Sequence, residues 1–140
     1  MKVIIIQNSR WDDKVNFVDE NNVALGYDMG QDCCEHADWF ICSNACRTSA
    51  LFEQHSNSKH TDGLESYTFD KNFHIVLEQM DDERDEAYGV LEDGGMAIFK
   101  VVSSCCFPDL YIHIYNSHNG YYGHGFDFCE NEKTLLEGSL

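Results

Sequence analysis

The apolar residues of this chain occur in short runs that are rich in β-branched and aromatic side chains, separated by clusters of Asp, Asn, Ser and Gly. Such runs are typical of β-strands, and none is long enough for a signal-peptide core or a membrane span. The chain has 140 residues, of which 43% are hydrophobic, enough for one packed core. We therefore expect a single domain, residues 1–140, of α+β class: a mainly antiparallel β-sheet with one or two short helices.

The first apolar runs predict a strand and a hairpin. No polar residue interrupts residues 3–6, so we expect a strand that is buried on both faces. Residues 15–18 and 23–27 flank the turn-forming cluster 19–22, a pattern that predicts a β-hairpin. Further strands are predicted at 37–42, 73–77 and 96–102, a short helix at 47–54, and a surface loop at 55–63.

The dipeptide Asn119-Gly120 predicts a second hairpin. It lies between the strand candidates 110–118 and 121–129, and it suits the positive φ angles of a type I′ turn. A two-residue turn would pair His118 with Tyr121. One face of this hairpin would then carry Tyr111, His113, Tyr115, Tyr122, His124, Phe126 and Phe128. Such a face is more often core than a small-ligand pocket, so we expect His113 to be hydrogen-bonded inside the protein.

The charge of the chain limits its partners. Its 25 Asp and Glu residues against nine Lys and Arg give a formal net charge of −16. A nucleic-acid binder neutralises phosphates with clustered cations, whereas the cations here are scattered, so direct binding to nucleic acid or to an anionic membrane is disfavoured. The negative field instead favours a basic protein partner. Without an export signal, we expect the chain in the cytoplasm.

The densest negative segment is residues 78–93, where eight carboxylates are opposed only by Arg84. The simplest interpretation is a solvated helix face or loop. Paired carboxylates also suit metal-dependent nucleases, but this field would repel a phosphate backbone. The residues we expect to contact a basic partner are Asp81, Asp82, Glu83, Asp85, Glu86, Glu92 and Asp93, with Asp19 and Glu20 as secondary contributors.

Two short motifs carry a family resemblance. They are Gln31-Asp32-Cys33-Cys34-Glu35 and, within 117–122, Asn119-Gly120-Tyr121-Tyr122. Their order and spacing resemble a functionally uncharacterised family of small phage and bacterial proteins. The chain departs from that family's pattern at His36, Trp39, Cys42 and Cys46, and at Gly123-His124-Gly125. The resemblance implies a phage or prophage setting and supplies no activity.

Charge and resemblance together lead to one functional hypothesis. The chain would be a non-enzymatic acidic protein that binds and inhibits a basic host protein, such as a nucleic-acid-handling or defence factor, with carboxylates that mimic phosphates. A chain of this kind requires no cofactor. The competing interpretation is that the acidity only maintains solubility.

The cysteines support an alternative hypothesis. There are seven of them, an odd number in a chain without an export signal, so we expect reduced thiols. The fourteen positions 33–46 hold the candidate zinc ligands Cys33, Cys34, His36, Cys42 and Cys46. Only Cys42 and Cys46 are spaced so that neighbouring turns of chain could bring both onto one metal ion, and then only if the segment is helical. His36 with Cys33 or Cys34 would supply the other two ligands. Buried thiols without a metal are the simpler interpretation.

A cysteine nucleophile is the enzymatic form of this alternative. Cys33 and Cys34 lie beside Asp32, Glu35 and His36, and His113 or His124 could approach them in space. Neighbouring carboxylates raise the pKa of a thiol, whereas a nucleophile needs a lowered pKa. We therefore do not expect an enzyme.

Overall fold

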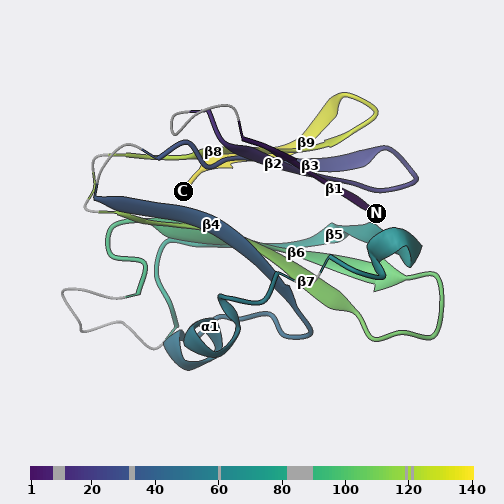
Figure 1. Cartoon of the computed structure of the whole chain (residues 1–140), viewed down its shortest axis with the longest axis horizontal. Coiled ribbons are helices and arrows are strands. Elements are labelled where there is room, and N and C mark those ends of the chain that lie inside the picture. Colours follow the sequence, from purple (N-terminus) through teal and green to yellow (C-terminus); the bar gives the residue numbers. More distant parts are fainter. Residues whose placement is uncertain (8–11, 32–33, 60, 82–89, 119, 121) are drawn as a thin grey trace.

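The computed structural model describes residues 1–7, 12–31, 34–59, 61–81, 90–118, 120 and 122–140. Two antiparallel sheets are stacked face to face (Figure 1). The first contains, in spatial order, β1 (Lys2–Ile6), β2 (Lys14–Val18), β3 (Val23–Asp28), β8 (Gly125–Glu130) and β9 (Lys133–Ser139). The second contains β4 (Glu35–Cys42), β7 (Leu110–His118), β6 (Gly95–Ser103) and β5 (Tyr67–Leu77). Helix α1 (Ser49–His55) and the 3₁₀ turn Leu64–Ser66 complete the described elements. The expected α+β class with mainly antiparallel sheet is confirmed.

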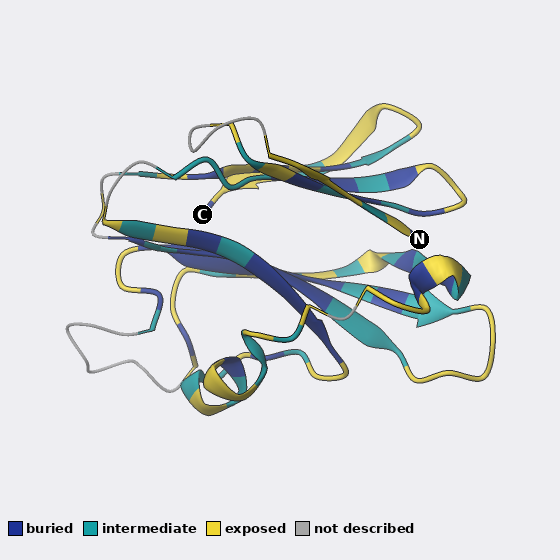
Figure 2. Cartoon of the chain, in the orientation of Figure 1, coloured by how far each residue is buried: buried dark blue, intermediate teal, exposed yellow. Residues whose placement is uncertain are grey.

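The main core lies between the two sheets. Successive side chains of a strand point to opposite faces, and the inward-facing set is large and apolar. Phe17 of β2 meets Trp39 of β4 edge to face, with ring centroids 5.2 Å apart. Phe128 of β8 packs on Phe99 of β6 with centroids 5.0 Å apart. Figure 2 shows the buried residues concentrated on the facing strands.

A second apolar cluster covers the opposite face of the four-stranded sheet. It includes Phe40, Cys42, Cys46, Phe52 and Tyr115. Phe52 comes from α1, which lies against this face (Figure 1), and its ring is 4.9 Å from that of Tyr115. The centre of β4 and β7 is therefore buried on both faces, which places the outward-facing residues of these strands in a second protected environment.

The predicted hairpin of β2 and β3 is confirmed. Its register pairs Lys14 with Asp28 and Val18 with Ala24. Asp19 holds the turn: one carboxylate oxygen accepts hydrogen bonds from the backbone N–H of Asn21 and Val23, both at 2.9 Å. The other accepts from Phe69 N–H of the opposite sheet, also at 2.9 Å. Since Asp19 is buried, its predicted role as a surface contact is wrong; Glu20 next to it is exposed.

The first strand exists, but its predicted burial is wrong. β1 pairs only with β2 and forms an edge of the five-stranded sheet. Ile4 and Ile5 consequently keep 47% and 49% of their surface exposed. A run of β-branched residues shows a strand, but it does not show whether the strand lies at the centre or the edge of a sheet.

The second predicted hairpin is also wrong. β7 pairs with β4 and β6, whereas β8 pairs with β3 and β9, so the segment between them crosses from one sheet to the other. Gly120 has the positive φ, 87°, that a glycine turn predicts, and Asn119 and Tyr121 lie outside the described residues. The expected single face is therefore split: Tyr111, His113 and Tyr115 share the α1 side of their sheet, while Phe126 and Phe128 point into the main core. A turn signal is local and does not determine which strands pair.

The described chain shows no helix that is long and apolar enough to cross a membrane.

Candidate metal centre

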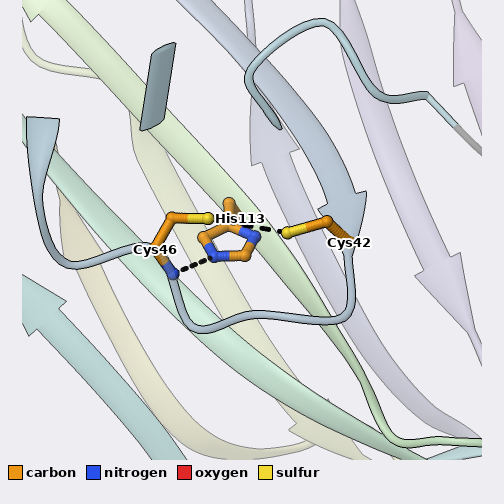
Figure 3. A group of neighbouring side chains, drawn as sticks. All are labelled: Cys42, Cys46 and His113. Carbon is orange, nitrogen blue, oxygen red and sulfur yellow. Dashed lines mark hydrogen bonds between the residues drawn. The ribbon is translucent and has the colours of Figure 1, made fainter. Parts of the chain in front are cut away.

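Two thiols and an imidazole meet on the α1 side of the four-stranded sheet. Cys42 is the last residue of β4, Cys46 lies in the connection that leads to α1, and His113 lies at the centre of β7. The ligand atoms of the three residues are all within 4.8 Å of one another, and all three residues are buried. Figure 3 shows the His113 ring beside both cysteine side chains, with dashed lines for the sulfur–sulfur contact and for the bond from the Cys46 backbone nitrogen to the ring. This is the one group of potential metal ligands found in the described part of the chain.

Strand register brings these residues together. Phe40 pairs with His113 and Cys42 pairs with Tyr111 across β4 and β7, so Phe40, Cys42 and His113 share one face of the sheet. The chain then turns back after Cys42, and the Cys46 backbone N–H donates to Nε2 of His113 at 3.0 Å. The return places the Cys42 and Cys46 sulfurs 3.5 Å apart. The carbonyl oxygen of Asn44 accepts from both thiols, at 3.2 and 3.6 Å.

His113 is fully buried, and its ring is held in one orientation. It stacks on Phe40 with centroids 4.1 Å apart and an interplanar angle of 5°. Because Nε2 accepts a hydrogen bond, the neutral ring carries its proton on Nδ1. Nδ1 is buried and has no hydrogen-bond partner among the described residues. Buried polar atoms without a partner are exceptions in folded proteins, so this histidine differs from an ordinary core histidine.

Burial also keeps the imidazole neutral. Desolvation lowers the pKa of His113 from 6.5 to about 3; the backbone carbonyls of Tyr111 and Phe40 lie near enough to the ring to offset part of the effect, but neither makes a hydrogen bond of good geometry with Nδ1. A metal binds the neutral form of imidazole. Coordination at either ring nitrogen would require the Cys46 N–H to leave Nε2: a metal at Nε2 takes the lone pair, and a metal at Nδ1 moves the ring proton to Nε2.

The two thiols are electrostatically unequal. The hydrogen bond with Cys46 lowers the pKa of Cys42 to about 7; burial opposes this shift, and a backbone hydrogen bond at Asn44 adds to it. The same sulfur–sulfur hydrogen bond, followed by burial, raises the pKa of Cys46. One thiolate is therefore accessible near neutral pH, and thiolate is the form that binds metal.

The donor set suits a zinc-type ion. Zinc prefers thiolate and imidazole ligands in a tetrahedral arrangement, with Zn–S distances of about 2.3 Å. Two sulfurs on such an ion lie about 3.8 Å apart, close to the 3.5 Å that separates them here. Three protein ligands leave a fourth position for water or another donor.

The structure brings together only part of the predicted ligand set. Cys42 and Cys46 do meet, but a strand end and a returning loop bring them together, not the helix that we expected. His36 is exposed and lies six residues before Cys42 on β4, about 20 Å along a strand. Cys34 is exposed and precedes that strand. Their predicted place in this metal site is therefore wrong, and Cys33 lies outside the described residues.

His113 is a candidate ligand that the sequence did not indicate for the metal site. Its separation of 67 residues from Cys46 gives no spacing signal. The useful signal was strand alternation, which places His113 on the same side of its strand as Tyr111 and Tyr115. Only the pairing of β4 with β7 turns that alternation into proximity to Cys42.

The two resemblance motifs meet at the other end of β4. Glu35 pairs with His118 in the register of β4 and β7. The Glu35 carboxylate lies 3.1 Å from Nε2 of His124, and Nδ1 of that ring lies 3.0 Å from the Asp28 carbonyl oxygen. Gln31 donates to the Ala37 carbonyl oxygen at 3.0 Å. In the second motif, the Gly120 N–H donates to Nδ1 of His118, and the Tyr122 carbonyl oxygen accepts from the Asn116 side chain.

The Glu35–His124 contact connects the start of β4 in one sheet with the residue before β8 in the other. The motif residues Asp32, Cys33, Asn119 and Tyr121 lie outside the described residues.

The acidic segment is only partly described. Asp81 forms an exposed ion pair with Arg47, Nε to Oδ2 3.0 Å, and Glu92 and Asp93 are exposed. Asp82, Glu83, Asp85 and Glu86 lie outside the described residues. The seven described Lys and Arg residues include four that pair with carboxylates: Arg47, Lys59, Lys71 and Lys100.

Comparisons with family models, curated proteins and solved structures found no match to this chain. The resemblance to the phage and bacterial family therefore stays a prediction.

Proposed function

We propose that this chain is a non-enzymatic metal-binding protein in which Cys42, Cys46 and His113 hold a zinc-type ion. The observation that carries the proposal is the cluster itself: three ligand atoms within 4.8 Å of one another, one of them on a fully buried histidine. The unpartnered Nδ1 of that histidine is a second sign that the ring serves as more than core packing.

The position of the cluster supports a structural role for the metal. Cys42 keeps 8% of its surface exposed, and Cys46 and His113 keep none, so the ion would lie inside the protein, with Cys42 the one residue of the three that reaches the surface. The ion would tie the connection after β4 to the centre of β7. That connection leads into α1, whose Phe52 packs edge to face on Phe40 at 5.7 Å. Metal binding would therefore stabilise the packing of α1 against the second apolar cluster.

Cobalt(II) titration of the metal-free protein tests the proposal. Thiolate coordination of cobalt gives charge-transfer and visible absorption bands, so the spectrum reports both binding and ligand type. We expect saturation at about one ion per chain, with zinc displacing cobalt. Cys42→Ser, Cys46→Ser and His113→Ala should each weaken binding strongly. Cys129→Ser and His36→Gln are the matched controls, because these residues lie outside the cluster, and should bind as the parent does. Equal binding by all five variants would refute the assignment.

A second candidate function rests on the charge. The net charge of −16 already includes all nine Lys and Arg residues, so the field around the chain is negative. This supports binding to a basic host protein of the nucleic-acid-handling or defence class, with the carboxylates of 78–93 as contacts and nucleic-acid mimicry as the mode.

Binding to a polylysine peptide provides a defined test of this second candidate. The affinity should fall as salt rises from about 0.05 to 0.5 M, since screening weakens exposed charge pairs. The variant Glu92→Lys/Asp93→Lys should bind more weakly than Glu53→Lys/Glu65→Lys, which changes net charge equally on exposed residues elsewhere. Equal losses would show that only net charge matters, and an affinity independent of salt would exclude the candidate.

A further inference from the structure

The sulfurs of Cys42 and Cys46 are in direct contact at 3.5 Å. A disulfide bond has an S–S length of about 2.05 Å, so the sulfurs need to approach by about 1.5 Å. Rotation about the side-chain bonds can supply such a movement. The connection between the two residues has only three residues, and its Asn44 carbonyl already accepts from both thiols. The backbone is thus folded so that both side chains face each other.

The other described cysteines lie in different parts of the fold. Cys34 precedes β4, Cys105 and Cys106 lie in the exposed turn between β6 and β7, and Cys129 is in β8. Within the described residues, a sulfur–sulfur contact is found for Cys42 and Cys46. This contact makes Cys42 and Cys46 the pair at which we expect an internal disulfide to form.

We propose that Cys42 and Cys46 are a reversible thiol–disulfide site that reacts with a low-molecular-weight disulfide such as oxidised glutathione. The reaction itself depends only on the sulfur pair. Its consequence for metal rests on the proposed function: the disulfide removes two of three ligands, so oxidised protein releases zinc and zinc-loaded protein is protected.

The reaction balances in two exchange steps. Cys42, the residue of the pair with more exposed surface, gives its proton to solvent, and its sulfur attacks one glutathione sulfur; a protein–glutathione bond forms and the other glutathione leaves as a thiolate. Cys46 gives its proton to that thiolate or to solvent, and its sulfur attacks Cys42. The Cys42–Cys46 bond forms and the first glutathione leaves. The protein loses two hydrogens with two electrons, and the oxidant becomes two thiols.

The test uses the full chain, stripped of metal with a chelator and mixed with oxidised glutathione. Differential alkylation and peptide mapping identify the cysteines that react, and intact mass should fall by about 2 Da when the internal bond forms. Cys46→Ser removes the resolving thiol and should accumulate the mixed disulfide at Cys42. Cys129→Ser is the control and should oxidise like the parent. Dithiothreitol should restore both thiols.

Three outcomes separate this inference from the proposed function. A Cys42–Cys46 bond that forms at least tenfold more slowly with zinc present supports both. The same bond in a protein that binds no zinc supports the inference and overturns the proposed function. Zinc binding in a protein whose Cys42 stops at the mixed disulfide, or whose bond maps to Cys105 and Cys106, overturns the inference alone.

Discussion

His113 and His124 are both buried histidines, but their rings are satisfied to different extents. Both ring nitrogens of His124 have partners: the Asp28 carbonyl at 3.0 Å and the Glu35 carboxylate at 3.1 Å. His113 uses Nε2 to accept from Cys46 and has no partner for Nδ1 among the described residues. His124 thus resembles a structural histidine that joins strands. His113 has thiols and an aromatic ring beside it, the environment of a soft metal ligand.

The comparison shows that burial alone does not identify a functional histidine. What distinguishes the two is the balance of donors and acceptors around the ring. Both ring nitrogens of His124 already have hydrogen-bond partners, so no further ligand is needed there. The thiols beside His113 become strong metal ligands only when they lose their protons. The two rings should therefore differ in their effects on stability, metal dependence and pH response.

The largest loss of stability is expected when His124, whose ring nitrogens both have partners, is replaced. His124→Ala leaves the Glu35 carboxylate, whose side chain is 1% exposed, without its ring partner. Losing the hydrogen bond of such a buried group costs about 1–3 kcal/mol, and deleting the buried ring adds the cost of a cavity, so the sum should exceed the effects below. Urea unfolding measures this loss, and the folded variant should still bind cobalt. His124→Leu with Glu35→Leu should lose clearly less, because no buried polar group is left without its ring partner; an equal loss would mean that packing, not the hydrogen bond, dominates.

Zinc should stabilise the protein through His113 and not through His124. A ligand at about 100 times its dissociation constant raises the free energy of unfolding by about 2.7 kcal/mol. Thermal or urea unfolding with and without zinc should show that increase in the parent and in His124→Ala. His113→Ala should show no increase. If zinc stabilised His113→Ala as well, the ion would bind elsewhere.

Acid should destabilise the metal-free protein through His113. Its pKa is about 3 in the folded chain against 6.5 in the unfolded chain, so the unfolded chain binds more protons between those values. This contribution to stability is complete above pH 6.5 and is lost as pH falls toward 3, at about 1.4 kcal/mol per unit. Between pH 6.5 and 5 the parent should lose about 2 kcal/mol more than His113→Leu. Parallel pH curves would contradict a buried neutral imidazole.

The smallest predicted effect is local to one amide. Metal at either nitrogen of His113 displaces the Cys46 N–H from Nε2. NMR spectra of labelled protein should therefore show zinc shifting the Cys46 amide resonance, while the His124 ring resonances stay in place. A Cys46 amide that does not shift would place the metal away from His113.

The sequence predicted most strands because their signal is local. The β2–β3 hairpin followed from apolar runs around a turn cluster, and α1 was expected close to its observed range. β9 was missed because Lys133–Ser139 holds only Leu135 and Leu136 as large apolar residues. The separation of β7 and β8 into two sheets was missed because strand partners depend on long-range packing, which the Asn119-Gly120 turn signal does not report.

The candidate site was predictable in part for the same reason. Cys42 and Cys46 are four residues apart, so a single reversal of the chain after β4 is enough to bring their sulfurs together. His113 joins them through the Phe40–His113 pairing of β4 and β7, a non-local contact. His36 lies on the same side of β4 as Cys42 by alternation, but its distance along the strand keeps it out of the cluster.

Native mass spectrometry after zinc titration and buffer exchange tests the central claim most directly, because it counts ions per folded chain. The account predicts one zinc for the parent and for His124→Ala, and none for Cys42→Ser, Cys46→Ser or His113→Ala at the same zinc concentration. A parent chain that retains no zinc, or triad variants that retain it as fully as the parent, would contradict the assignment of Cys42, Cys46 and His113 as a metal centre.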